Sequence, residues 1–119
     1  MEPGLAVLRL QHVIVRRPFA VVVPTVDGIR YVVSMFGTIS DWVQNLDAAG
    51  GDAIISHGGF VRVHLALVPS AQRAPILREY VRVASSGRKH FPLAAGAPLA
   101  DFQAIAELYP VYRIEVPTA

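Results

Sequence analysis

Apolar and polar positions along the first half of the chain follow the period of two that is typical of β-strands. Residues 5–15 are rich in Val, Leu and Ile, residues 19–23 form a short apolar run, and residues 29–36 alternate. One face of this third segment carries Ile29, Tyr31, Val33 and Met35. The pattern predicts three strands.

The sequence Asp27-Gly28 separates the second and third apolar segments. Asp-Gly between apolar runs favours a tight hairpin, because both central residues of the preferred turn need a positive φ. Pro24 lies nearby and lacks an amide N–H, so it is expected at a strand end or edge.

A second hairpin is predicted from residues 52–56 and 60–68, joined by His57-Gly58-Gly59. The alternation predicts that four apolar side chains point inward and two polar ones outward. The inward set is Val61, Val63, Leu65 and Leu67, and the outward set is Arg62 and His64.

Between the hairpins the period becomes helical. Ser40 is a favourable N-cap, Asp41 suits the positive end of the helix dipole, and Gly50-Gly51 supplies a C-terminal stop. The apolar positions at helical spacing are Trp42, Val43, Leu46 and Ala49.

Two further helices are predicted after Pro69, separated by a loop over residues 85–97. Pro75 fits the first turn of one and Pro98 the first position of the other, which extends to Leu108. The first has the stripe Ile76, Leu77, Tyr80, Val81 and Ala84, and the second has Leu99, Phe102, Ile105 and Ala106.

The chain ends in an alternating segment, residues 111–116, with Tyr112, Ile114 and Val116 on one face. Short antiparallel strands with inserted helices, without regular βαβ alternation, favour a barrel. We therefore expect an α+β fold: a small split β-barrel of about six mainly antiparallel strands with two to three helices. Residues 1–119 are expected to form a single domain.

Composition narrows the class of protein. The chain is 53% hydrophobic and 17% charged, which favours a packed core over disorder. It has no cysteine, which excludes disulfides, thiolate metal sites and thiol nucleophiles. Arginines are scattered singly apart from Arg16-Arg17, so nucleic-acid binding is not expected. No secretory signal or membrane-length apolar run is present, so an integral membrane segment is not expected and the default location is cytoplasmic.

Residues 27–51, which contain Trp42-Val43-Gln44-Asn45-Leu46, resemble the central segment of the actinobacterial deazaflavin-dependent nitroreductase family. In that family a hairpin, a strand and a glycine-containing loop precede Trp-x-x-Asn-Leu. Similar segments occur later in the chain, at Leu77-Arg78-Glu79-Tyr80, His90-Phe91-Pro92 and Tyr109-Pro110-Val111-Tyr112-Arg113-Ile114.

The resemblance implies a split β-barrel of the FMN-binding type that binds coenzyme F-420, an 8-hydroxy-5-deazaflavin. It also implies an oxidoreductase that transfers a hydride from the reduced cofactor to a nitro compound, a quinone or a similar electrophilic small molecule. The chain would orient the cofactor ring, exclude water and hold the anionic tail.

The cofactor-binding residues that the resemblance implies gather around the strand end and the following helix. They are Arg16, Arg17, Ser34, Met35, Phe36, Gly37, Ser40, Trp42 and Asn45. Free N–H groups at the start of the helix at Ser40 suit a phosphate, and the guanidiniums of Arg16 and Arg17 can clamp one. Each has a structural alternative: Ser40 as a simple cap, Arg16-Arg17 as a solvated pair, and Trp42 as a core residue.

The catalytic residues stay unassigned by sequence, with Tyr80 and His90 as candidates to donate a proton to the reduced substrate. The four histidines, His12, His57, His64 and His90, show no HxH or HExxH spacing, so no metal site is expected.

One segment departs from the family pattern. Where the family has Gly-Arg-Lys/Arg-Ser-Gly at the end of its first strand, only the basic pair Arg16-Arg17 is kept. Two alternatives therefore stay open. One is a catalytically impaired, shortened paralogue that acts as a binding or subunit-interaction module, for which a homodimer is considered. The other is an FMN-binding split-barrel protein.

Overall fold

In the part of the chain that it describes, the computed structural model has seven strands, two α-helices with described bounds, and helical residues at positions 43, 44 and 46. The structure describes residues 5–10, 19–35, 43, 44, 46, 50–56, 60–84 and 91–116. The strands are β1 (Leu5–Leu10), β2 (Phe19–Val22), β3 (Thr25–Val26), β4 (Ile29–Val33), β5 (Asp52–Ser56), β6 (Phe60–Leu67) and β7 (Val111–Glu115). The helices are α2 (Ala74–Val83) and α3 (Leu99–Ile105), with 3-10 turns η2 (Ser70–Gln72) and η4 (Ala106–Leu108).

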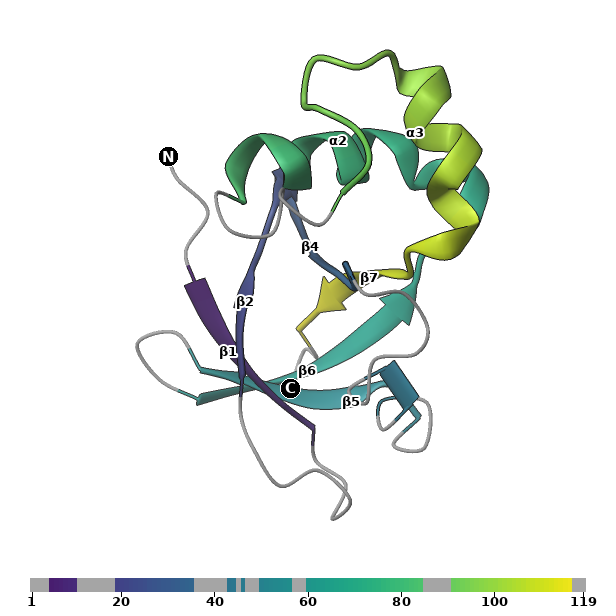
Figure 1. Cartoon of the computed structure of the whole chain (residues 1–119). Coiled ribbons are helices and arrows are strands. Elements are labelled where there is room, and N and C mark those ends of the chain that lie inside the picture. Colours follow the sequence, from purple (N-terminus) through teal and green to yellow (C-terminus); the bar gives the residue numbers. More distant parts are fainter. Residues whose placement is uncertain are drawn as a thin grey trace.

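The strands form one curved sheet in the order β2-β1-β5-β6-β7-β4-β3, and every pairing is antiparallel (Figure 1). The two ends of this order, β2 and β3, are consecutive in the chain and are separated only by Val23 and Pro24. One continuous stretch therefore pairs with β1 through its first half and with β4 through its second half. This closes the sheet and confirms the predicted split barrel.

The turn between β3 and β4 has the predicted geometry. Asp27 has a φ of 51° and Gly28 a φ of 78°, as a turn with two left-handed central residues requires. Pro24 lies in the break between β2 and β3, where its carbonyl accepts a hydrogen bond from the Tyr31 N–H at 3.0 Å. The break at Pro24 confirms the expectation of a strand end.

The barrel interior holds the first of two apolar cores. Val63 and Leu65 of β6 are 1% and 3% exposed, which confirms two of the predicted inward positions. Leu46, in the described part of the helix at residues 43, 44 and 46, plugs this interior. The members are Val23, Val32, Leu46, Ala53, Ile55, Val63, Leu65, Tyr112 and Ile114.

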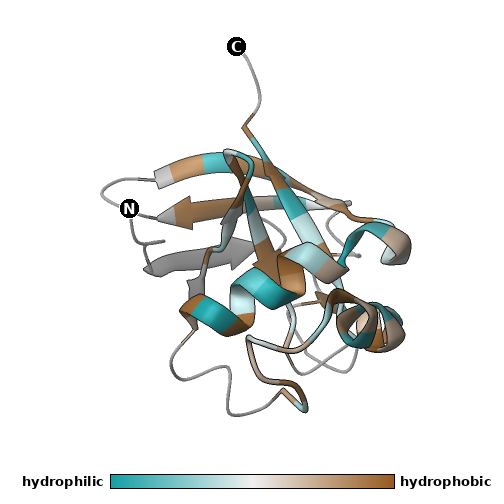
Figure 2. Cartoon of the chain, turned by 90° about the horizontal axis from the view of Figure 1, so that it is seen from above, coloured by the Kyte–Doolittle hydropathy of each residue, from teal (hydrophilic) through white to brown (hydrophobic). Residues whose placement is uncertain are grey.

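The second core lies outside the barrel, between its wall and the two helices, which cover the same end of the strands (Figure 1). Its helical side is the predicted stripe of α2, and the amphipathic pattern of that helix is visible in Figure 2. The strand side includes Tyr31, Val33 and Met35, so the predicted apolar face of β4 faces the helices. Pro75 lies in the first turn of α2, as predicted.

Two apolar residues predicted to be inward, Val61 and Leu67, are exposed, by 44% and 59%. They lie near the two ends of β6, and Val116, which directly follows β7, is 52% exposed. Leu99, in the first turn of α3, is 39% exposed. Pro98 is the N-cap of α3 and not its first helical residue. The predictions of Val61 and Leu67 as inward residues and of Pro98 as the first helical residue were wrong.

Gly50 and Gly51 have φ values of 65° and 90°, which confirms the predicted helix stop. The Gly51 N–H donates to the Leu46 carbonyl at 3.0 Å, and the Gly51 carbonyl accepts from the Leu65 N–H at 2.8 Å. A Cβ on Gly51 would lie 2.9 Å from the Leu65 carbonyl oxygen, so this position needs glycine for space as well as for φ.

Candidate functional site

Two of the predicted cofactor-binding residues, Ser34 and Met35, lie in the described structure, at the end of β4. The others, Arg16, Arg17, Phe36, Gly37, Ser40, Trp42 and Asn45, lie outside the described residues, as does His90. The geometry of the candidate site is therefore built from the end of β4 and from what packs against it.

Ser34 continues the barrel ladder one residue past β4. Its N–H donates to the Pro110 carbonyl at 2.9 Å, and the residue is 1% exposed. Met35 follows on the outer side, where it is half-buried and packs against the helix-covered core. The strand end therefore directs Met35 toward α2.

Tyr80 of α2 meets Met35 there. Its hydroxyl donates to the Met35 Sδ over 3.5 Å, and the residue is 3% exposed. Burial raises the pKa of the Tyr80 hydroxyl above its ordinary value, so this group stays protonated at neutral pH. The structure thus joins two residues that the sequence analysis placed in separate roles, one at the cofactor and one at the substrate.

An aromatic cluster of Tyr80, Phe91 and Tyr109 extends from this contact. The ring centroids of Tyr80 and Phe91 are 5.6 Å apart at 49°, and those of Phe91 and Tyr109 are 4.5 Å apart at 27°, a stacked pair. Such pairs add about 0.5–1.5 kcal/mol beyond area burial. Met35 and Tyr109 are half-buried, so the cluster reaches the surface at these two residues, whereas Tyr80 and Phe91 are buried.

Arg73, the N-cap residue of α2, holds the surroundings of this cluster together. It is 7% exposed; its Nε donates to the Val68 carbonyl at 2.8 Å, and its Nη1 donates to the carbonyls of Ala106 at 2.9 Å and Tyr109 at 3.4 Å. Desolvation lowers its pKa, which the fields of Tyr112 and Glu107 partly oppose. The sequence analysis did not identify this residue. The one feature that could have indicated its role is that a charged residue directly precedes the apolar stripe of α2.

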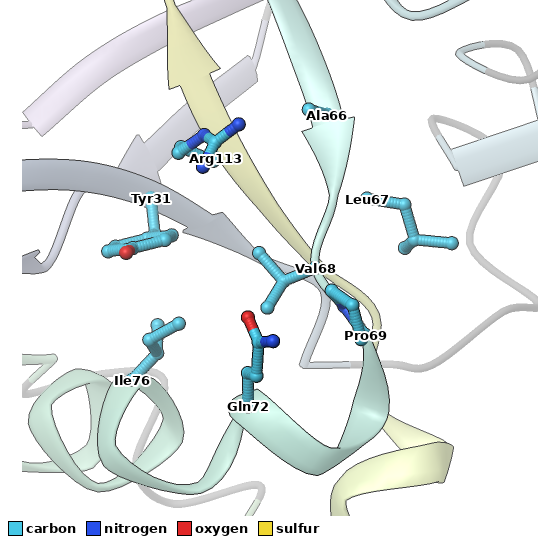
Figure 3. Close-up of a pocket in the computed structure, with 8 residues that line it drawn as sticks. All are labelled: Tyr31, Ala66, Leu67, Val68, Pro69, Gln72, Ile76 and Arg113. Carbon is cyan, nitrogen blue, oxygen red and sulfur yellow. The ribbon is translucent and has the colours of Figure 1, made fainter.

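A cleft of about 130 Å³ lies at the other end of the same outer face (Figure 3). Tyr31, Arg113 and Ala66 lie side by side on β4, β7 and β6, because Arg113 is paired with both of the other two. Gln72 and Ile76 face them from the helical side. The lining residues are Tyr31, Ala66, Leu67, Val68, Pro69, Gln72, Ile76 and Arg113.

Within the described ranges, no three His, Asp or Glu side chains lie close enough together to hold a metal ion. No helix in the described part of the chain is both long and apolar enough to cross a membrane.

No family model matches the chain, and no curated protein matches its sequence. Several solved structures match its fold, and three of them, each with a TM-score of 0.55, are the following. An FAD-binding protein from Mesorhizobium loti is 14% identical, with 96% of this chain and 81% of that chain covered. An F420 reductase is 9% identical, with 98% and 89% covered. PhzG from Burkholderia lata 383, in complex with tetrahydrophenazine-1-carboxylic acid, is 11% identical, with 98% and 67% covered.

These likenesses confirm the expected α+β split barrel and extend over nearly the whole chain. At such low identity they show the fold and leave the ligand to be argued from the site.

Proposed function

We propose that this protein is a deazaflavin-dependent reductase that binds the cofactor ring against Met35 and the aromatic cluster. The observation that carries the proposal is the Met35–Tyr80 contact, which brings the end of β4 to a cluster of packed rings that reaches the surface at the half-buried Tyr109. Support also comes from the sequence resemblance around Trp42 and from the shared fold of a protein described as an F420 reductase.

The described residues fit a planar ring ligand: ring faces and a thioether to pack on, and one hydroxyl that stays protonated. When bound and reduced, the deazaflavin would supply a hydride to an electrophilic small molecule. The cluster would orient the ring and exclude water, and the Tyr80 hydroxyl, once released from Met35, would donate the proton to the reduced substrate. The guanidiniums of Arg16 and Arg17 and the amides at Ser40 would hold the phosphate.

Titration of the purified protein with oxidised coenzyme F-420, followed by ring absorbance or fluorescence, tests this proposal. We expect a saturable change at tens of micromolar, and Tyr109→Ala should weaken binding about threefold to tenfold through loss of the half-buried ring at the surface of the cluster. The adjacent, 64% exposed Leu108 provides the matched control: Leu108→Ala should bind as wild type does. An unchanged ring signal at these concentrations would contradict the proposal.

An FMN site in the same barrel is the second candidate, and the structural likeness to a protein described as FAD-binding favours it. Titrating FMN beside coenzyme F-420 separates the two, because the tighter binder identifies the cofactor. The remaining alternative, a subunit-interaction module, predicts a homodimer by light scattering together with affinity for neither cofactor.

A further inference from the structure

We propose that the cleft between Tyr31, Gln72 and Arg113 is a second binding site, for a small aromatic carboxylate built on a single ring. It lies on the outer wall of the barrel, beside Tyr31 in the middle of β4, four residues before Met35. This inference is independent of the proposed reductase function, because no residue of the cleft belongs to the aromatic cluster or to the predicted cofactor-binding set.

Size limits the ligand to one ring. The cleft measures about 130 Å³, and an apolar cavity of about 150 Å³ in another protein admits benzene. Its lining is mixed: the Tyr31 ring on one side and Ile76 and Val68 on the other can pack against a ring, and the polar groups of Arg113 and Gln72 lie beside them (Figure 3). A two-ring or three-ring ligand would not be enclosed.

Charge and hydrogen-bond donors select the carboxylate. The lining contains one guanidinium, Arg113, and no carboxylate, although the guanidinium is paired with Glu115 outside the lining. The Tyr31 hydroxyl and the Gln72 amide supply further donors beside it. Gln72 extends its amide toward the sheet (Figure 3), which places polar groups on both sides of the opening.

Arg113 has donors to spare for a ligand. Its Nε and Nη2 both bind one oxygen of Glu115, Oε2, two residues along β7. Among the described residues no acceptor is bound to Nη1. The Arg113 and Glu115 side chains are 49% and 39% exposed, and an ion pair this exposed is held weakly enough to be shared with an incoming carboxylate.

Because Arg113 is paired with Glu115, removing either charge should change the affinity for benzoate in opposite directions. Amide chemical shifts of the full chain would be followed while sodium benzoate is added, with benzylamine as the cationic counterpart. We expect benzoate to bind in the millimolar range, as is usual for so few atoms, with shifts confined to the cleft residues. Arg113→Gln should weaken binding about fivefold, whereas Glu115→Gln should tighten it about twofold to threefold by releasing the guanidinium.

Two further variants separate occupancy of the cleft from a general charge effect. Ala66→Leu should abolish benzoate binding by filling the cleft while keeping the dispersion of the amide spectrum. Arg62 lies on the same strand as Ala66, β6, but is absent from the lining. Arg62→Gln should therefore leave the affinity unchanged. Benzoate binding that survives Ala66→Leu, that matches benzylamine, or that produces no shifts at the cleft would overturn the proposal, whatever the outcome of the cofactor titration.

Discussion

The two apolar cores of this protein share strands β4 and β7 but are assembled in different ways. The interior core is formed by alternate residues of the barrel strands, with Leu46 as the plug. The outer core is formed where α2 and α3 cover the wall, so helical spacing on one side meets strand spacing on the other. Val32 and Tyr112 face inward, whereas their neighbours Val33 and Val111 face the helices.

This difference explains why β4 and β7 have no polar face where they pair between Val33 and Val111. Strands covered on both sides lose the alternation of apolar and polar residues, as buried strands generally do. Away from the helices β7 has a solvent face again, and Arg113 and Glu115 form an ion pair there. Helix coverage therefore stops between Val111 and Arg113, and the cleft opens at that boundary.

The largest expected effect compares the two cores directly. Phe102 of α3 is fully buried in the outer core, and Phe102→Ala should lower the free energy of unfolding by about 3–5 kcal/mol. Leu65→Ala is the interior counterpart and should cost about 2–5 kcal/mol. Urea unfolding followed by circular dichroism and tyrosine fluorescence should give coincident transitions in both variants. Separate transitions in Phe102→Ala would show that the outer core unfolds on its own.

Arg73 ties the helical layer to the barrel, and its removal should affect the outer core more than the interior. Arg73→Met keeps the apolar stem but leaves the carbonyls of Val68, Ala106 and Tyr109 without this donor. We expect a loss of about 2–3 kcal/mol in unfolding free energy, with weakened amide protection around η4 in hydrogen exchange. Arg78→Met, on the exposed face of the same helix, should change stability by less than about 0.5 kcal/mol.

Gly51 offers a smaller test on the barrel side. Gly51→Ala adds a Cβ 2.9 Å from the Leu65 carbonyl oxygen at a φ of 90°, so it should cost about 2 kcal/mol. Gly50→Ala has open space around its Cβ at a φ of 65°, and the left-handed conformation alone should cost about 1 kcal/mol. Thermal unfolding of the pair measures the difference, and equal melting temperatures would refute the role given to the Leu65 carbonyl.

Tyr80→Phe should have the smallest effect at neutral pH, below about 1 kcal/mol, because it removes one weak hydrogen bond to sulfur. The folded pKa of Tyr80 is raised above its ordinary 10.0, so its contribution is complete below pH 10 and is lost as pH rises through the folded value. Wild type should therefore lose stability more steeply above pH 10 than Tyr80→Phe does. Parallel curves from urea unfolding at pH 9 to 11 would contradict this account.

Parts of the candidate site could be predicted from sequence, and parts could not. Ser34 and Met35 were reached through the resemblance, and Tyr80 was a candidate proton donor. Met35 and Tyr80 are 45 residues apart in the sequence, and they meet only because α2 packs against the end of β4. Arg73 was missed because its partners are backbone carbonyls, which carry no residue-type signal.

The sequence by itself determined the local elements: the Asp27-Gly28 turn, the stop at Gly50-Gly51, the apolar stripe of α2 and the alternation of β6. These follow from backbone conformational preference and from periodicity, which are properties of neighbouring residues. Tertiary structure alone decided which face of β4 the helices cover, which strand ends stay exposed, and where the cleft opens. Those outcomes depend on contacts between distant segments, because a side chain is buried only by what packs over it.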